Sequence, residues 1–325
     1  MSKGKKVTAV GVIVVIMIAA IAFVLVDRYK DKIEEGSNKE YDFYTESYQE
    51  KEYKGKKYEY NTDIQTIAFL GVDTREKAEE GSMPGWNGQS DTILVAVIDT
   101  ATEKAKILQI PRDTMTIIEL YDIHGEYYIS EKAQLAFQYA YGDGGVTSCV
   151  LVTDRISELL GEIPITYYLS LNMDGIPALS EAMGGIDIVI EEDMTYIDPE
   201  YTKGKKVTLK GEDAEHFVRY RDTNETGSNA PRMKRQDQVI QAIMHQLPEK
   251  AKDDSDMYGK LFKQADKYMT TNLKLDNIEA LEKYDFDEEI INVPGTLQEG
   301  EYHDEFYIDE EQFMGIIIDL FYKEK

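Results

Sequence analysis

Four arginines lie close together in one segment of an acidic chain. The segment, residues 218–240, reads VRYRDTNETGSNAPRMKRQDQVI and contains Arg219, Arg221, Arg232 and Arg235. The chain of 325 residues has only eight arginines against 28 lysines, and its formal net charge is −26. A guanidinium forms two parallel hydrogen bonds with a carboxylate or a phosphate, whereas a lysine ammonium acts as a point charge. The cluster therefore predicts either a bound anion or ion pairs with the chain's own carboxylates.

Two aspartates flank expected strands at positions suited to a metal ion. Asp73 comes directly after the apolar run 66–72, and Asp91 begins the apolar run 91–99. If these runs form neighbouring antiparallel strands, the two carboxylates lie at the same edge of the sheet and repel each other unless a cation lies between them. Two carboxylates completed by substrate phosphates form a common shell for Mg²⁺. The alternative is that each aspartate only caps a turn.

Two further arginines also follow expected strands. Arg75 lies two residues after Asp73, and Arg112 directly follows the apolar run 105–111. Because ligand sites in α/β proteins favour the loops beyond strand ends, both arginines are candidates for the same site. Asp113 stands next to Arg112 and is a candidate for orienting its guanidinium.

The segment 232–247 has the periodicity of a helix. Five residues would share one face of this helix, because each follows the previous one by three or four positions. They are Arg232, Gln236, Val239, Ile243 and Leu247. The face begins with groups that bind an anion and continues with apolar groups. It therefore matches either a ligand with a charged head and a long hydrocarbon tail, or an ordinary core helix with a solvated first turn.

These candidate residues need strands and helices to position them. The hydrophobic patterns predict strands at 66–72, 91–99, 105–111, 165–171, 186–190, 206–210 and 289–293. They predict helices at 131–141, 146–160, 173–185, 213–217, 232–247, 258–272 and 309–323. The short polar turn between the second and third strands predicts a hairpin. Strands that alternate with helices indicate an α/β domain with helices on both faces of its sheet.

The N-terminal part of the sequence predicts the topology. Residues 7–26 are uncharged and apolar, and three lysines precede them. A run of about 20 apolar residues has the length that a membrane-spanning helix needs. By the positive-inside rule, residues 1–6 form a cytoplasmic tail, the charged and tyrosine-rich residues 27–62 form a spacer, and residues 63–325 form a domain outside the cytoplasm. The alternative is a cleaved signal peptide, because small residues at 20–22 resemble a cleavage site.

Composition excludes several classes of function. The sequence pI is about 4.5 and no basic face stands out, which argues against a nucleic-acid partner. The single Cys149 excludes an intrachain disulfide and a cysteine-based zinc site, and the four histidines lack metal-ligand spacing. An exported domain without disulfides is typical of a Gram-positive-type cell surface.

Eight segments in order resemble the LytR-CpsA-Psr family. They are FLGVDTR (69–75), SDTILVAVID (90–99), ILQIPRDT (107–114), AFQYAYGDGG (136–145), ITYYLSLNMDGIPALSEAMGGIDIVI (165–190), LKGEDAEHFVRYRD (209–222), RMKRQDQVI (232–240), and VPG with YIDEEQF (293–295 and 307–313). Their order and spacing match from about residue 64 to the C-terminus. This is a specific resemblance, because it does not rest on one short motif.

The resemblance implies a fold and an activity. The expected fold is a three-layer α/β/α sandwich with a central mixed sheet, preceded by one transmembrane helix. The expected activity is that of a membrane-anchored phosphotransferase, which moves a glycopolymer from a polyprenyl-pyrophosphate carrier to a peptidoglycan hydroxyl and forms a phosphodiester. The polymer would be teichoic acid, capsule or another wall polysaccharide.

The resemblance also implies roles for the candidate residues. Asp73 and Asp91 would hold Mg²⁺ or Mn²⁺, and either could accept the proton of the attacking hydroxyl. Arg112, Arg219 and Arg221 would be catalytic. The residues expected to bind the pyrophosphate are these three arginines with Arg232 and Gln236, supported by Arg75 and Arg235.

The sequence departs from the family pattern at three places. Gln89 stands where family members often have arginine, and Pro231 stands where glycine is common. The loop 76–89 is long and contains the only tryptophan, Trp86, which would either stack on an acceptor sugar or pack on its own domain.

Two other functions are compatible with the sequence. The chain could pass the same lipid-linked polymer to water as a pyrophosphatase, or it could be a non-catalytic lipid-binding or regulatory membrane protein.

Overall fold

The computed structural model describes residues 48–325 with several gaps. The gaps are 75–82, 173–174, 221–230, 233, 236–237, 240–241, 244–245, 248, 251–253, 255–256, 266–267, 274–283 and 301–302. The expected membrane-spanning segment 7–26 and residues 27–47 of the expected spacer lie outside the described residues. Among the helices of the described part of the chain, none is long and apolar enough to cross a membrane.

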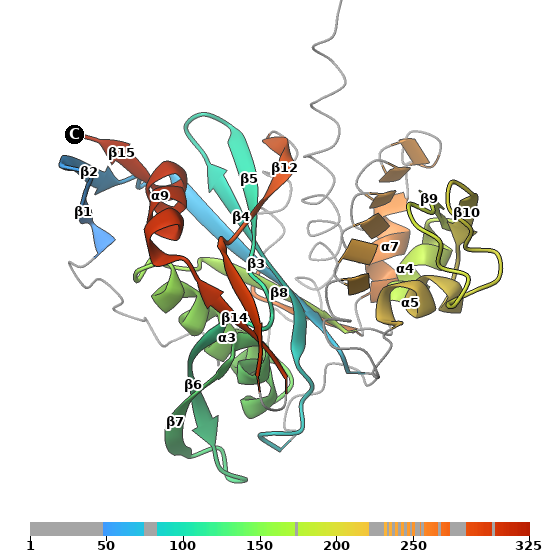
Figure 1. The fold of residues 1–325 in the computed structure, drawn as a ribbon, viewed down its shortest axis with the longest axis horizontal. Coiled ribbons are helices and arrows are strands. Elements are labelled where there is room, and N and C mark those ends of the chain that lie inside the picture. The colour runs from blue at the N-terminus through green and yellow to red at the C-terminus, as the bar shows by residue number, and fades with distance from the viewer. Residues whose placement is uncertain are drawn as a thin grey trace, which may run out of the picture.

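A mixed sheet of six strands forms the centre of the molecule (Figure 1). In spatial order its strands are β11 (Met269–Thr271), β8 (Tyr167–Asn172), β3 (Ile64–Val72), β4 (Ser90–Asp99), β5 (Lys104–Gln109) and β12 (Asp285–Asn292). β3, β4 and β5 are antiparallel neighbours, whereas β8 runs parallel to β3 and β12 runs parallel to β5. The predicted antiparallel pairing of 66–72 with 91–99 and the hairpin with 105–111 are confirmed.

Two apolar cores lie on the two faces of this sheet. Even-numbered residues of β4, such as Leu94, belong to one core and odd-numbered residues, such as Val95, to the other, as the period of two along a strand requires. The first, called here the α7-side core, includes α4 (Gly175–Ala182), α5 (Glu212–Arg219) and α7 (Met257–Ala265). The second, the α3-side core, includes α3 (Val146–Leu159) and α9 (Glu310–Phe321). Helices therefore cover both faces of the sheet, as predicted.

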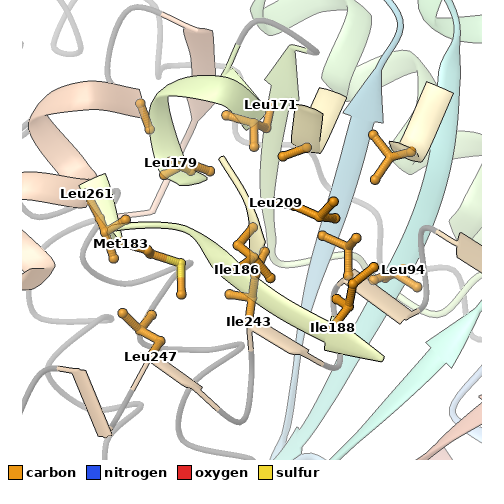
Figure 2. Packing of buried hydrophobic residues seen from close by; sticks show 14 of the residues in the cluster. Leu94, Leu171, Leu179, Met183, Ile186, Ile188, Leu209, Ile243, Leu247 and Leu261 are labelled. Carbon is orange, nitrogen blue, oxygen red and sulfur yellow. The ribbon is translucent and has the colours of Figure 1, made fainter. Parts of the chain in front are cut away.

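The α7-side core joins helices to a small hairpin (Figure 2). This hairpin consists of β9 (Ile186–Val189) and β10 (Lys206–Leu209), which pair antiparallel. The described residues of the segment 231–250 are helical, and Ile243 and Leu247 of this segment lie buried against the hairpin and α7. The apolar residues of the predicted helix face 232–247 therefore belong to the α7-side core.

The predicted helix 131–141 is wrong in its first turn. Residues up to Gln134 belong to β7 (Tyr127–Gln134), which pairs antiparallel with β6 (Met115–Tyr121), and the 3₁₀ helix η2 (Leu135–Tyr141) follows. Pairing with β6 overrides the helical preference of this stretch, because a tertiary partner outweighs the weak preferences of single residues.

The C-terminal third also contains strands that the patterns did not predict. The expected helix 258–272 ends with α7, after which β11 adds to the central sheet. A hairpin of β13 (Gly295–Glu299) and β14 (Asp304–Ile308) precedes α9. The closing helix ends at Phe321, and the last residues form β15 (Tyr322–Glu324). Short polar strands carry little hydrophobic signal, which is why the patterns missed them.

The end of the expected spacer 27–62 is folded, which corrects the predicted domain boundary. β1 (Glu50–Tyr53) and β2 (Lys56–Tyr60) form a three-stranded sheet with β15. Tyrosines supply the apolar face of this sheet: Tyr48 is buried in the α3-side core and packs edge-on against Tyr60, with ring centroids 5.1 Å apart. The sequence prediction missed this three-stranded sheet because residues 27–62 contain few aliphatic residues. Tyrosine rings take the place of aliphatic side chains in its packing.

Removal of one tyrosine ring is expected to weaken the attachment of this small sheet. The Tyr322 hydroxyl donates a hydrogen bond to the Tyr48 carbonyl oxygen (2.7 Å), and its ring lies 6.0 Å from that of Tyr60. Tyr322→Ala is therefore expected to lower the free energy of unfolding by about 3 kcal/mol, measured by urea unfolding. Lys323→Ala is the control, because the exposed Lys323 side chain forms an exposed ion pair with Asp63. Equal losses in the two variants would contradict this assignment.

Candidate functional site

Asp73 and Asp91 lie at the same end of the paired strands β3 and β4. Gly71 pairs with Thr92 and Val72 pairs with Ser90, so Asp91 is an extra residue on β4, in a β-bulge. Bulges redirect side chains and are frequent beside active sites. Asp73 follows β3, and its Oδ1 accepts the N–H of Gln89 (2.6 Å). The predicted placement of the two carboxylates at one sheet edge is confirmed.

Asp91 is held between two buried arginines. Its Oδ1 accepts a hydrogen bond from Nη1 of Arg112, and its Oδ2 forms an ion pair with Nη1 of Arg232 (3.0 Å). The exposed fractions are 4% for Asp91, 9% for Arg112 and 8% for Arg232. One carboxylate thus serves two guanidinium groups away from solvent, where charge interactions are strong. The sequence left open whether the arginines bind an anion or pair with the chain's own carboxylates. In this structure Arg112 and Arg232 form ion pairs with a carboxylate of the chain itself.

The Arg112 guanidinium contacts three side chains of the protein. Besides Asp91, it donates from Nη2 to Oε1 of Gln89 (2.6 Å), and its Nε lies 3.2 Å from Oδ1 of Asp113. Asp113 also accepts a hydrogen bond from Nε2 of Gln134 at the end of β7 (2.8 Å). The expectation that Asp113 orients Arg112 is consistent with this geometry. Gln89 and Gln134 were missed, because nothing in their local sequence indicates which distant side chain they contact.

Arg232 reaches the site from the α7-side layer. It lies at the start of the helical segment 231–250, and Val239, Ile243 and Leu247 of the same segment are buried in the α7-side core. Arg112, in contrast, follows β5 of the central sheet. The ion pairs of Asp91 therefore connect the sheet edge to the neighbouring helical layer.

Arg235 binds backbone carbonyl groups at the end of α5. Its Nε donates to the Phe217 carbonyl oxygen (2.8 Å), and its Nη2 donates to that of Tyr220. Burial lowers the pKa of Arg235; the electrostatic influence of Tyr196 opposes this shift, and the Arg232 charge adds to it. A buried cation on the carbonyl end of a helix is favourably placed. Arg235 therefore fixes α5 relative to the segment 231–250.

Arg219 lies in the last turn of α5 and pairs within its own helix. Its Nη1 lies 3.0 Å from Oε1 of Glu215, and its side chain is 33% exposed, so it is more accessible than the arginines that bind Asp91. Arg75, Arg221 and Gln236, which were also predicted to contribute, lie outside the described residues. Their roles stay predictions.

Arg235→Met is expected to lower the free energy of unfolding by about 2 to 3 kcal/mol. The reason is that the buried carbonyl groups of Phe217 and Tyr220 lose charged hydrogen-bond donors. The measurement is urea unfolding followed by circular dichroism. Lys234→Ala is the matched control from the same helical turn, because the exposed Lys234 side chain forms ion pairs with the exposed Glu191 and Glu192. A loss no greater than that of the control would contradict the positioning role of Arg235.

The carboxylates at the sheet edge fit a hard divalent cation of the Mg²⁺ type. Within the described ranges there is no group of three or more His, Cys, Asp or Glu side chains that could hold a metal ion. Asp73 and Asp91 are two oxygen donors at one sheet edge, and Mg²⁺ usually takes one or two carboxylates together with water and substrate phosphates. Both oxygens of Asp91 contact guanidinium groups here, so the donor set fits this class of ion only if a phosphate-bearing substrate completes it and takes over Arg112 or Arg232 from Asp91.

Comparisons with known proteins agree on one family. The LytR_cpsA_psr family model matches residues 30–308. Proteins named polyisoprenyl-teichoic acid–peptidoglycan teichoic acid transferase TagU are similar: that of Bacillus mycoides is 28% identical over 218 residues, and that of Bacillus subtilis is 27% identical over 215 residues. These alignments cover 67% and 66% of this chain but only 63% and 61% of those proteins.

Solved structures show the same fold. Protein gbs0355 of Streptococcus agalactiae superposes with a TM-score of 0.60 and 22% identity, covering 80% of this chain and 87% of that one. The crystal structure of Bacillus subtilis TagU gives a TM-score of 0.53 and 24% identity, covering 80% and 96%. The structure described as TagT bound to LI-WTA gives 0.55 and 22%, covering 80% and 90%. Because the family model spans most of the chain, and because motif order and fold agree with it, the chain belongs to the LytR_cpsA_psr family.

Proposed function

We propose that this protein is a phosphotransferase that moves a glycopolymer of the teichoic-acid class from a polyprenyl-pyrophosphate carrier to a peptidoglycan hydroxyl. The observation that carries the proposal is the buried Asp91 between Arg112 and Arg232, beside Asp73 at the same sheet edge. The names of the TagU relatives support the substrate class.

The charge arrangement suits a diphosphate. Arg112 and Arg232 share the carboxylate of Asp91. A diphosphate offers several anionic oxygens and can accept hydrogen bonds from both forks at once, which one carboxylate cannot do equally well. Arg219, on the end of α5 that Arg235 fixes, is the more exposed cation and is proposed to bind the same anion.

The proposed reaction is an in-line substitution at phosphorus. The oxygen of the acceptor hydroxyl forms a bond to the phosphorus that carries the sugar, the bond from this phosphorus to the bridging oxygen breaks, and polyprenyl phosphate leaves with that oxygen. The hydroxyl proton passes to a carboxylate of the Asp73–Asp91 pair. Such transfers need positioning and charge stabilisation rather than covalent participation by the protein.

Asp73 and Asp91 are the residues that would hold the divalent cation, Mg²⁺ or Mn²⁺. When bound, this ion would neutralise negative charge on the phosphate oxygens. The polyprenyl chain is proposed to leave the arginines on the side of the segment 231–250, where Arg232 is followed by apolar residues. Residues 7–26 are proposed to anchor the protein in the cell membrane as a single span, with the domain outside the cytoplasm.

Three parallel reactions distinguish the proposed function from its alternatives: one with the full-length chain, one with its Arg112→Ala variant and one without protein. Each is incubated with polyprenyl-linked polymer, Mg²⁺ and peptidoglycan, and polymer covalently bound to peptidoglycan is measured. We expect a product that depends on Mg²⁺ and on Arg112. Free polymer without a wall product would identify a hydrolase. If Arg112→Ala forms as much wall-bound polymer as the unmodified chain, the assignment of the transfer site to Arg112 and its neighbours is contradicted.

A further inference from the structure

The loop 83–89, called here the Trp86 loop, presents an unusually exposed tryptophan. Its sequence, MPGWNGQ, has no charged residue, although 30% of the chain is charged. The Trp86 side chain is 82% exposed, and Met83 in the same loop is also exposed. The alternative that Trp86 packs on its own domain is therefore wrong. Trp86 and Met83 therefore place exposed apolar surface on the loop that ends at the candidate site.

The backbone that carries Trp86 is anchored on both sides of the indole. The Gly85 N–H donates to the Ala140 carbonyl oxygen (2.6 Å), and the buried Asn87 side chain donates from Nδ2 to the carbonyl oxygens of Gly142 (2.7 Å) and Met83 (3.0 Å). The loop is thus fixed to η2 while its tryptophan faces solvent. An aromatic group on an anchored backbone loses little conformational entropy when a ligand covers it.

The loop leads directly into the candidate site. Gln89 at its end donates its N–H to Oδ1 of Asp73 and accepts a hydrogen bond from Arg112. Gly88 has a φ of +77°, and a Cβ at this position would lie 2.9 Å from Oδ1 of Asp73, so the backbone approaches the carboxylate closely. Movement of the loop would therefore disturb both Asp73 and Arg112.

The Trp86 loop and Arg232 approach the site from different layers. The loop is bonded to η2, which contributes Leu135 and Tyr139 to the α3-side core, whereas Arg232 belongs to a segment packed in the α7-side core. In phosphoryl transfer the attacking and leaving oxygens lie roughly in line on opposite sides of the phosphorus. A polyprenyl phosphate that leaves on the side of Arg232 and an acceptor that approaches from the side of the Trp86 loop would satisfy this in-line arrangement.

We propose that Trp86 forms an acceptor-saccharide subsite, in which its indole stacks on a pyranose ring of the peptidoglycan glycan strand next to the attacking hydroxyl. This inference rests on the proposed function for the identity of the acceptor. The C–H groups on the face of a pyranose ring pack well against an aromatic ring, and tryptophan offers the largest such surface. The uncharged loop suits a sugar ring better than the phosphate groups of the donor.

Binding can be tested without any transfer reaction, because Trp86 is the only tryptophan in the chain. Its fluorescence therefore reports on this position alone. The full-length protein is titrated with soluble, undecorated peptidoglycan glycan fragments, without donor. We expect a saturable blue shift of the emission as the sugar replaces water around the indole. Emission that is unchanged at all fragment concentrations would overturn the proposal.

Kinetics test the same subsite during transfer. Trp86→Ala is expected to raise the KM for the peptidoglycan acceptor about tenfold, and Trp86→Phe to restore part of the loss. The KM for the lipid-linked donor should not change. Tyr128→Ala is the matched control, because Tyr128 is also an exposed aromatic residue (74%) but lies on β7 outside the Trp86 loop; it should leave both constants unchanged.

The outcomes separate this inference from the proposed function. Normal acceptor KM in Trp86→Ala, or a change in donor KM instead, would overturn the acceptor subsite while transfer itself remained. A saturable fluorescence response in a protein that makes no wall product would support the glycan subsite and reject the transferase.

Discussion

Asp91→Ala is expected to abolish polymer transfer and to lower the free energy of unfolding by about 3 kcal/mol. Its removal leaves the guanidinium groups of Arg112 and Arg232 buried without the carboxylate that they share. Breaking a buried ion pair by removing one partner is strongly destabilising because the remaining charge stays desolvated. Activity is measured as wall-bound polymer, and stability by urea unfolding.

Asp73→Ala is expected to abolish transfer with a loss of only about 1 kcal/mol. Asp73 is partly exposed, and its carboxylate accepts the N–H of Gln89 rather than balancing a buried cation. The two variants therefore form a matched pair in which activity falls equally but stability does not. Equal stability losses would contradict the assigned roles, and so would unchanged turnover in either variant.

Arg112→Ala is expected to reduce transfer by about a hundredfold to a thousandfold, and Arg112→Lys is expected to restore little of it. The magnitude is that of losing one charge-stabilising donor from an active site. Lysine fails because Arg112 contacts Asp91, Gln89 and Asp113 through different nitrogens of one rigid fork. A single ammonium cannot replace this geometry. The measurement is the initial rate of wall-product formation at saturating donor.

Arg155→Lys is the matched control for the Arg112 variants. Arg155 is also a largely buried arginine, but it lies on α3, where it forms an ion pair with Glu158 (2.8 Å). It has no contact with Asp91 in the described structure, so transfer by Arg155→Lys should remain within about twofold of the unmodified protein. A comparable loss of transfer in Arg155→Lys would show that the Arg112 effect reflects general destabilisation.

The sequence by itself determined the elements whose signal is local. The nearly continuous apolar runs 66–72 and 91–99 predicted β3 and β4, because a strand that contacts a core on each of its two faces is apolar at nearly every position. The nearly continuous apolar character of 146–160 predicted α3. The placement of Asp73 and Asp91 at one sheet edge also followed, since antiparallel pairing of neighbouring strands fixes where their ends lie.

Only the tertiary structure decided which charges meet. Nothing near Asp91 indicates that a bulge redirects its side chain, or that Arg112 and Arg232 share it. Arg235 has the same local pattern as a ligand-binding arginine, yet its guanidinium holds the end of α5. The physical reason is that hydrophobic periodicity is set within a few residues, whereas a buried ion pair depends on how distant segments pack. The partner of each buried charge is therefore a property of the assembled layers and not of the local sequence.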